Sequence, residues 1–429
     1  MAKEEAAAMP PHGAARADEA RRSAGMGVVV ALLVVSVLIS YIDRGNLSVA
    51  MPLIKVELGL NAAHIGVLLS AFFWTYTIML FVLCWLVDRI DVSALLALGF
   101  LVWSLATAAT ALVSSFALIL LMRLLLGVGE SVSFPCYCKI LARDLPEQRR
   151  GLANGAIIAG MKLGPAVGTL GAGTLMTQFG WRPAFLVIGL ASLLWLPAWW
   201  RWRPRANAAP EALVVGDASA ATKAPPVLDI FQQPAFWATV AGAFCNAYPL
   251  YFMVTWLPYY LVQGQHLSMA QMVHTAALYY TVDAGAALAS GVLTDRLIRS
   301  GAAAGAVRKA IMVVGFGVAA LGFMGCAQSG SHDYLAWLIV TGIGLGTGNA
   351  GVWTFTQTLA GPRAVGRWSS LQNGFGNLAG VLGPMLTGYL VQWRGTFTAA
   401  ILVTAGTCLV GALVWGRLIG EFRQVDWAR

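Results

Sequence analysis

The sequence predicts an all-α membrane protein with twelve transmembrane helices in two six-helix repeats. Of its 429 residues, 58% are hydrophobic and 11% are charged, against about 25% charged in soluble domains. Uncharged segments recur that match the ~20 residues a helix needs to cross a bilayer. Lysine and arginine also gather in alternate connections between these segments. These observations exclude a soluble enzyme and a disordered protein.

The uncharged segments set the approximate helix positions. Each is bounded by charged, Gly-rich or Pro-rich residues, and two connections are only a few residues long. We expect helices at about 26–54, 62–87, 92–112, 115–138, 151–177, 183–200, 236–262, 270–293, 308–328, 334–360, 367–391 and 396–416.

The positive charges predict the topology. Connections facing one side contain only Lys55, Arg182 and Arg394, and three cations lie inside helices. The termini and the other connections hold the remaining twenty-two of the twenty-eight Lys and Arg residues. Because cytoplasmic loops are enriched in these residues, we expect a multi-pass protein of the cell inner membrane with both termini cytoplasmic.

The chain divides into two halves and three polar segments. Residues 1–25 form a cytoplasmic N-terminal tail and 26–200 the first six-helix bundle. Residues 201–235, rich in Ala and Pro, form a cytoplasmic linker. The second bundle covers 236–417, and 418–429 form the C-terminal tail.

The two halves resemble each other at corresponding positions. The matching pieces are Leu163-Gly164-Pro165 with Leu382-Gly383-Pro384, Trp181-Arg182 with Trp393-Arg394, and Asp88-Arg89 with Asp295-Arg296. Parallel six-helix repeats around a central site are typical of rocking-type secondary transporters. We interpret Asp88, Arg89, Asp295 and Arg296 as a cytoplasmic gate.

Several motifs resemble a known family. Gly291-Val-Leu-Thr-Asp295-Arg296 resembles the signature loop of the major facilitator superfamily, although Cys84 replaces the leading glycine of the first copy. Within that superfamily the chain resembles the anion:cation symporters, which implies the major facilitator fold and an organic-anion substrate. The motifs are Tyr41-Ile-Asp43-Arg44-Gly-Asn46, Phe72-Phe-Trp74-Thr-Tyr76, Arg123 through Glu130, Trp256-Leu-Pro258-Tyr259-Tyr260, and Ala360 through Asn377.

Six charges fall inside predicted helices. A charge at the bilayer centre costs about 2.5–3.5 kcal/mol on insertion scales, so each needs a reason. The three cations and three anions sum to zero, which favours mutual pairing in a polar region between the halves. They are Asp43, Arg44, Arg123, Glu130, Lys162 and Asp283.

Arg44 is the first candidate for substrate binding. A guanidinium offers a planar pair of donors matched to a carboxylate, and the resemblance assigns the same role to this position. The alternative is a structural arginine paired only with Asp43 or Glu130. Arg123 and Glu130 are seven residues apart, which places them on one face of a helix about 10 Å apart.

Asp43 and Glu130 are the candidate proton carriers. Burial favours the neutral form of a carboxyl group and a nearby cation favours the ionised form, so a change of pairing would load or release a proton. The resemblance points to the same two residues. The alternative is a pair of permanently ionised structural partners. Asn46, Arg123 and Asp283 are expected to complete the polar network.

Lys162 has two interpretations. It could be a second anchor that favours substrates with two acidic groups, or it could pair with a helix carboxylate such as Glu130. Asp283 could offer a second titratable site, bind substrate hydroxyls, or only cap the gate region. Further substrate-binding side chains are expected in helices that the resemblance brings to the cavity, namely Tyr41, Tyr76, Tyr251, Trp353, Gln357 and Asn373.

We therefore predict a transporter that imports an organic anion with protons by alternating access. The expected substrate is a carboxylate, such as a sugar acid, an aromatic acid or a dicarboxylate. The six scattered cysteines suggest no metal site, and we expect no cofactor, no nucleic-acid partner and a monomer. The alternatives are a proton/drug antiporter, favoured only by the glycine pattern around Gly164, and a non-transporting sensor.

Overall fold

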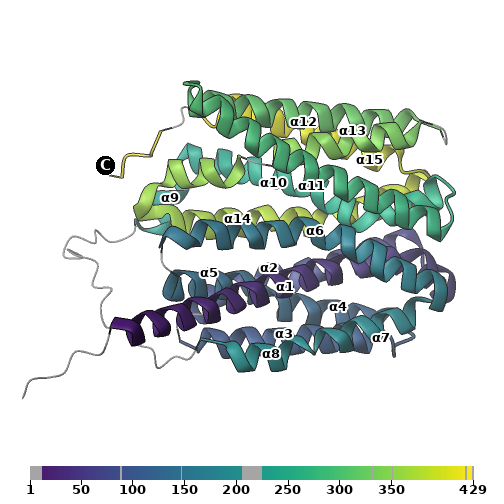
Figure 1. Cartoon of the computed structure of the whole chain (residues 1–429). Helices are drawn as coiled ribbons and strands as arrows, with labels where there is room; N and C mark the ends of the chain where they lie inside the picture. Colours follow the sequence, from purple (N-terminus) through teal and green to yellow (C-terminus); the bar gives the residue numbers. More distant parts are fainter. Residues whose placement is uncertain are drawn as a thin grey trace, which may run out of the picture.

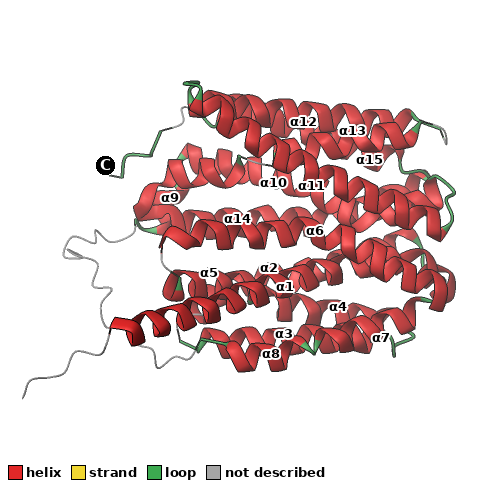
Figure 2. Cartoon of the chain, viewed as in Figure 1, coloured by secondary structure: helices red, strands yellow, loops and turns green. Residues whose placement is uncertain are grey.

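The computed structural model describes residues 12–86, 89–145, 147–204, 225–330, 333–349, 351–420 and 423–427. These residues form helices and no strand, and the long helices run side by side in one bundle (Figure 1 and Figure 2). The start of α1 and residues 423–427 lie at the same end of the bundle (Figure 1), which we call the tail end.

The described part of the first half contains eight helical segments. They are α1 (His12–Leu58), α2 (Ala62–Leu86), α3 (Val92–Thr110), α4 (Phe116–Ser131), α5 (Ser133–Asp144), α6 (Glu147–Phe179), α7 (Trp181–Ser192) and α8 (Trp195–Trp202). Polar caps fix two of the starts, because Asp91 accepts a hydrogen bond from Ala94 N at α3 and Ser115 accepts one from Leu118 N at α4.

The second half begins with a short helix after the linker. Its segments are α9 (Val227–Phe231), α10 (Pro234–Tyr259), η2 (Tyr260–Gly264), α11 (Met269–Arg299), α12 (Ala304–Gln328), α13 (Tyr334–Gly348), α14 (Val352–Arg394), α15 (Thr398–Leu413) and η3 (Val414–Leu418). A capping box between Ser268 and Gln271 fixes the start of α11.

All twelve predicted helices have a counterpart, with differences at their ends. α4 with α5 and α7 with α8 each make one predicted helix. α1 begins at His12 within the predicted tail, where Ala, Arg and Glu favour helix. Residues 1–11 of that tail, 205–224 of the linker, and 421–422 and 428–429 of the C-terminal tail lie outside the described residues.

Eleven of the described segments are long and apolar enough to cross a membrane. The part of α14 after Gly361 is helical but is not among them. It carries Arg363, Arg367, Gln372 and Asn373, which lower its hydropathy. The polar face of this helix is therefore expected to be shielded from lipid by other helices.

The repeat predicted from the sequence is confirmed by the packing of the helices. In the first half α1 packs against α6, α2 against α4, and α3 against α4 and α7. The corresponding pairs of the second half are α10 with α14, α11 with α13, and α12 with α13 and α15. The same partners thus meet in both halves, although no long sequence identity links them.

The repeated Trp-Arg dipeptides have different surroundings. Arg182 pairs with Glu57 at 2.5 Å and donates to the carbonyl groups of Ala111 and Val113, which ties together α1, α7 and the α3–α4 turn. Arg394 instead lies over the ring of Trp393. The first half is therefore more firmly fastened at the end opposite the tail end.

Three helix pairs join the halves. α2 packs against α14, α6 against α11, and α1 against α10. Small residues allow close approach at the first pair, since a side chain at Gly66 would meet the backbone of Pro384 and Gly388. At the third pair, Ser48 Oγ donates to the carbonyl oxygen of Thr255 at 2.7 Å.

The connection predicted at 361–366 is a single kink instead of a loop. Gly361 has φ 64°, and helix continues on both sides of it. The break frees two carbonyl groups, which residues of the C-terminal segment satisfy: Val425 N donates to Leu359 and Trp427 Nε1 donates to Ala360, each at 2.9 Å. A glycine with positive φ and two external donors therefore joins two helical segments without a loop.

Replacing Gly361 by alanine is expected to lower the free energy of unfolding by about 1–2 kcal/mol, because φ is positive. Gly366 provides a matched control, since it is helical and a Cβ there would contact nothing within 4 Å. Gly366→Ala should be neutral or stabilising by up to about 1 kcal/mol. Thermal unfolding of both variants in detergent tests this, and equal melting temperatures would contradict the assigned strain.

Candidate functional site

A buried ion pair lies at the centre of the first half. Arg44 Nε of α1 lies 2.7 Å from Glu130 Oε2 of α4, and Ser40 Oγ donates to the same oxygen at 2.7 Å. Arg44 is 6% exposed and Glu130 is 0% exposed. Ser40 is one helical turn before Arg44, so both side chains leave the same face of α1.

Aromatic rings surround the guanidinium of Arg44. Its Cζ lies 4.6 Å from the ring centroid of Tyr41, 4.9 Å from that of Phe72 and 4.8 Å from that of Tyr76. These distances are typical of cation–π contacts. Within the described chain, neither Nη group of Arg44 makes a hydrogen bond. The rings therefore hold the guanidinium in place while its Nη donors stay available.

Asp43 lies next to Arg44 in sequence but does not pair with it. Asp43 is 1% exposed, its Oδ1 accepts from Asn46 Nδ2 at 3.2 Å, and its Oδ2 has no hydrogen-bond partner. Arg123 Nη1 donates to the backbone carbonyl of Asp43 at 3.4 Å and leaves the carboxyl group unpaired. In the part of the chain that the structure describes, Asp43 thus has one amide donor and no ion pair.

Close helix approach at glycines brings these side chains together. Gly127 lies between Arg123 and Glu130 on α4, and a Cβ there would meet the backbone of Phe72 and Tyr76. Gly164 of α6 lies against the Cβ of Tyr41 in the same way. The small residues therefore let α2 and α6 press their aromatic and polar residues against α1 and α4.

The second half contributes a polar network that adjoins this cluster. The ring of Tyr251 on α10 lies 4.3 Å from the ring of Phe73 on α2. Tyr251 donates to Asn377 Oδ1 at 2.7 Å, and Asn377 Nδ2 donates to the backbone and side-chain oxygens of Asn373. Two predicted residues, Tyr251 and Asn373, therefore belong to one network across the boundary between the halves.

Four contributors were missed as site residues: Ser40, Phe72, Phe73 and Asn377. Ser40, Phe72 and Asn377 each lie four residues from a predicted site residue on the same helix, a spacing that places them on one face. No such signal existed for Phe73, because its contact with Tyr251 depends on packing between the halves.

Lys162 pairs with a carboxylate of the opposite half. Its Nζ on α6 lies 2.8 Å from Asp283 Oδ2 on α11. The partner named for Lys162 in the sequence interpretation, Glu130, is instead held by Arg44. The reason is geometric, since α6 packs against α11 on the side of Lys162 and against α1 on the side of Gly164.

Other predicted residues lie apart from this cluster. Trp353 and Gln357 are exposed on α14, and no hydrogen bond or ring contact joins them to Arg44 in the described chain. Of the gate residues, Asp88 lies outside the described residues, whereas Arg89, Asp295 and Arg296 are exposed. The described residues contain no group of His, Cys, Asp or Glu placed to hold a metal ion.

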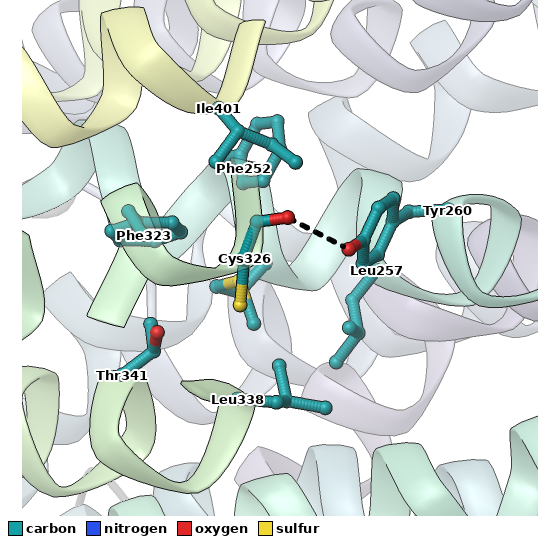
Figure 3. A pocket seen from close by; sticks show the side chains of 9 residues that line it. Phe252, Leu257, Tyr260, Phe323, Cys326, Leu338, Thr341 and Ile401 are labelled. Atoms are coloured by element: carbon teal, nitrogen blue, oxygen red, sulfur yellow. Dashed lines mark hydrogen bonds between the residues drawn. The ribbon is translucent and has the colours of Figure 1, made fainter. Parts of the chain in front are cut away.

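A small cavity occurs elsewhere, inside the second half (Figure 3). Its wall is mainly apolar and includes Phe252, Phe323 and Leu338, and Tyr260 donates to the Cys326 carbonyl oxygen at 3.5 Å beside it. Its volume of about 10 Å³ is at the lower limit for one water molecule. It is too small for an organic substrate, so the charged cluster remains the candidate site.

The chain matches one family model, described as Major Facilitator Superfamily, over residues 33–363. Among solved structures, a bacterial homologue of the human lysosomal transporter Spinster in an inward-facing, unoccupied conformation superposes with a TM-score of 0.77. It is 19% identical, and the match covers 95% of this chain and 99% of that one. This likeness concerns the fold alone.

Curated relatives are transporters. The chain is 28% identical to the probable sulfoacetate transporter SauU of Cupriavidus necator, over 90% of this chain and 92% of the relative. It is also 28% identical to the hexuronate transporter of Bacillus subtilis, over 91% and 94%. The probable galactarate/D-glucarate transporter GudP of the same organism is 26% identical, over 92% of each chain.

Removing one member of the Arg44–Glu130 pair is expected to destabilise the fold strongly. Glu130→Leu leaves Arg44 buried without its counter-ion and should cost about 3–5 kcal/mol, whereas adding Arg44→Met should recover part of this loss. Unfolding measurements on the two single variants and the double variant form the cycle.

The local pair Arg143–Asp144 serves as the control for this cycle. Its side chains are 28% and 16% exposed, so the same cycle there should give a coupling of about 1 kcal/mol or less. Additive effects of the Arg44 and Glu130 substitutions would contradict a buried, coupled pair.

Proposed function

Because the chain belongs to the Major Facilitator Superfamily, we propose that it is a secondary transporter that imports an organic anion, specifically a carboxylate, together with protons. It is a multi-pass membrane protein whose relatives are transporters and not enzymes. The observation that carries the proposal is the buried guanidinium of Arg44, whose two Nη groups have no partner in the described chain.

Arg44 suits the binding of a carboxylate. Its Nε is already fixed by Glu130 and its plane by three rings, so little side-chain freedom is lost when an anion binds. A carboxylate that accepts from the two Nη groups would make a charge-assisted, bidentate contact. The relatives named for sulfoacetate, hexuronate and galactarate or glucarate support this substrate class, because all of these are carboxylates.

Two carboxyl groups are the proposed proton carriers. Asp43 is buried with one amide donor, and Arg123 donates to its backbone carbonyl instead of its carboxyl group; an ionised carboxylate is costly in such surroundings. Glu130 depends on Arg44 for its charge compensation. A substrate carboxylate on Arg44 would compete for that compensation and favour a proton on Glu130. Substrate binding and protonation would therefore assist each other.

The same proposal assigns the orientation in the membrane. The tail end of the bundle is placed in the cytoplasm, because the connections there carry most of the Lys and Arg residues. The cell inner membrane, alternating access between the two halves and a monomeric protein complete the proposal. The contacts between α2 and α14, α6 and α11, and α1 and α10 would change during transport.

The glycine pattern of α6, which also occurs in drug antiporters, has a packing role here. Side chains at Gly160, Gly164 and Gly168 would meet Val37, Tyr41 and Ile42 of α1. The pattern therefore serves close approach of two helices, and the neighbouring Lys162 disfavours cationic drugs. These features favour an anion transporter over the efflux alternative.

Arg44→Lys is expected to weaken carboxylate binding by at least about tenfold, because one ammonium replaces two coplanar donors. The measurement is binding of D-gluconate to the detergent-purified protein by isothermal titration and by the shift of the melting temperature. Arg394→Lys, at an exposed arginine over Trp393, is the matched control and should bind as the wild type does. If Arg44→Lys binds D-gluconate with unchanged affinity, Arg44 is not the residue that binds the carboxylate.

Asp43→Asn and Glu130→Gln are each expected to abolish uptake driven by a pH gradient into proteoliposomes. Exchange of labelled for unlabelled substrate should persist in at least one of them, because exchange needs no net proton movement. Asp333→Asn, at an exposed carboxylate between α12 and α13, keeps the proposed titrating groups and should retain the pH dependence. Gradient-driven accumulation that survives in both variants would exclude these residues as proton carriers.

A further inference from the structure

The ion pair of Lys162 and Asp283 links the two halves near the proposed site. Nζ and Oδ2 lie 2.8 Å apart, and the two side chains are 22% and 9% exposed. Lys162 makes no other hydrogen bond in the described chain, so two of its three N–H donors are unused. A partly accessible ammonium with spare donors differs from a fully buried structural pair.

The packing of α6 on α1 places Lys162 on the helix that adjoins the one carrying Arg44. Gly164 lies against Cβ of Tyr41, whose ring lies 4.6 Å from the guanidinium of Arg44. Lys162 is two residues before Gly164, which amounts to about 3 Å along the helix axis. Because the two helices run in the same direction, with Gly160 against Val37 and Gly168 against Ile42, Arg44 lies beyond Tyr41 on the side away from Lys162. The backbone positions of the two cations are therefore roughly 7–8 Å apart along the bundle, on adjoining helices.

The charges around Lys162 are limited. On its own helix the other charged residues of the span, Arg149 and Arg150, lie at its start. From α11 the group in contact with Lys162 is Asp283, whereas Tyr279 packs against Gly342 of α13 and Tyr280 donates to the Met253 carbonyl oxygen of α10. Asp283 is thus the one carboxylate that the described chain presents to this ammonium.

We propose that Lys162 binds the second acidic group of a dianionic substrate, and that Asp283 holds this position when the substrate is absent. The inference rests on the proposed function, because it takes Arg44 as the anchor of the first carboxylate. The substrate class it names comprises organic acids with two acidic groups, either two carboxylates or a carboxylate and a sulfonate.

Replacement of Asp283 by the second acidic group of a substrate would let the site distinguish dianions from monoanions. A monoanion on Arg44 leaves Lys162 with Asp283, so its uncharged end gains nothing from the ammonium. A dianion offers its second acidic group to the same N–H donors in place of Asp283, whose side chain is 9% exposed. The substrate then replaces a contact between the halves by a contact of its own.

The test compares two probes of equal length that differ by one charge. D-Glucarate has an acidic group at each end, and D-gluconate has one. Their affinities are measured on wild type, Lys162→Gln and Asp283→Asn, and the quantity of interest is the ratio of the two dissociation constants. Sulfoacetate and glycolate provide a second pair with a shorter chain.

The proposal gives opposite expectations for the two variants. Lys162→Gln should weaken the binding of glucarate about tenfold or more, which is the effect of one charge-assisted hydrogen bond. It should change the affinity for gluconate less than about threefold. Asp283→Asn should strengthen the binding of glucarate, because the Asp283 carboxylate no longer competes for Lys162. It should leave the affinity for gluconate unchanged. If Lys162→Gln fails to fold, the effect of Asp283→Asn on the ratio decides the question.

Lys55→Gln is the matched control. Lys55 also joins the halves, through the ring of Tyr259 on α10 at 5.5 Å, but it lies eleven residues from Arg44 along α1. Its substitution should leave the ratio unchanged. Two results would show that the Lys162–Asp283 pair only holds the halves together. One is equal dissociation constants for glucarate and gluconate in the wild type, and the other is an equal loss of affinity for both probes in Lys162→Gln.

Failure of the proposed function would give a different result. In that case neither probe would bind to the wild type, or Arg44→Lys would bind both as tightly as the wild type does. Binding of gluconate that depends on Arg44, without any preference for glucarate, would retain the proposed function and overturn the role of Lys162.

Discussion

The pairing of Arg44 with Glu130 takes place among apolar helices, where an isolated charge would cost several kcal/mol. Much of the first half is arranged around this requirement. Ser40 supplies a second donor to Glu130, and the rings of Tyr41 and Tyr76 cover the guanidinium. The pair leaves the Nη groups of Arg44 without a hydrogen bond in the described chain, and a substrate carboxylate would need these donors. One contact thus connects stability with the proposed binding of an anion.

Small residues give this arrangement its geometry. Gly127 lets α2 approach α4, Gly164 lets α6 approach α1, and Gly380 of α14 lies against the ring of Phe73. At each of these places a larger side chain would separate the helices that carry the site. These glycines, of which Gly164 belongs to the pattern that suggested a drug antiporter, therefore explain how aromatic rings and charges from several helices come together.

The two halves share the same helix packing but differ in their buried charges. Corresponding helices meet in both halves, yet the buried Arg–Glu pair belongs to the first half, and the second half offers Tyr251, Asn373 and Asn377. The contact of Lys162 with Asp283 crosses between them. In the proposed function, the symmetric scaffold would permit two related arrangements of the halves, and the unequal charges would give a bound anion different contacts in each half.

The sequence by itself determined the twelve helices, the repeat and the residues that carry charge inside the membrane, because long apolar segments and costly buried charges are local properties of a chain. It also predicted Arg44 as a substrate-binding residue and Glu130 as a proton carrier, while leaving open whether Arg44 pairs with Asp43 or Glu130. The tertiary structure decided the partners: Glu130 for Arg44, Asp283 for Lys162 and Tyr251 for Phe73. It also replaced the loop expected at 361–366 by a kink closed with Val425 and Trp427. These outcomes depend on which faces of distant helices meet, and helical spacing along one segment carries no information about that.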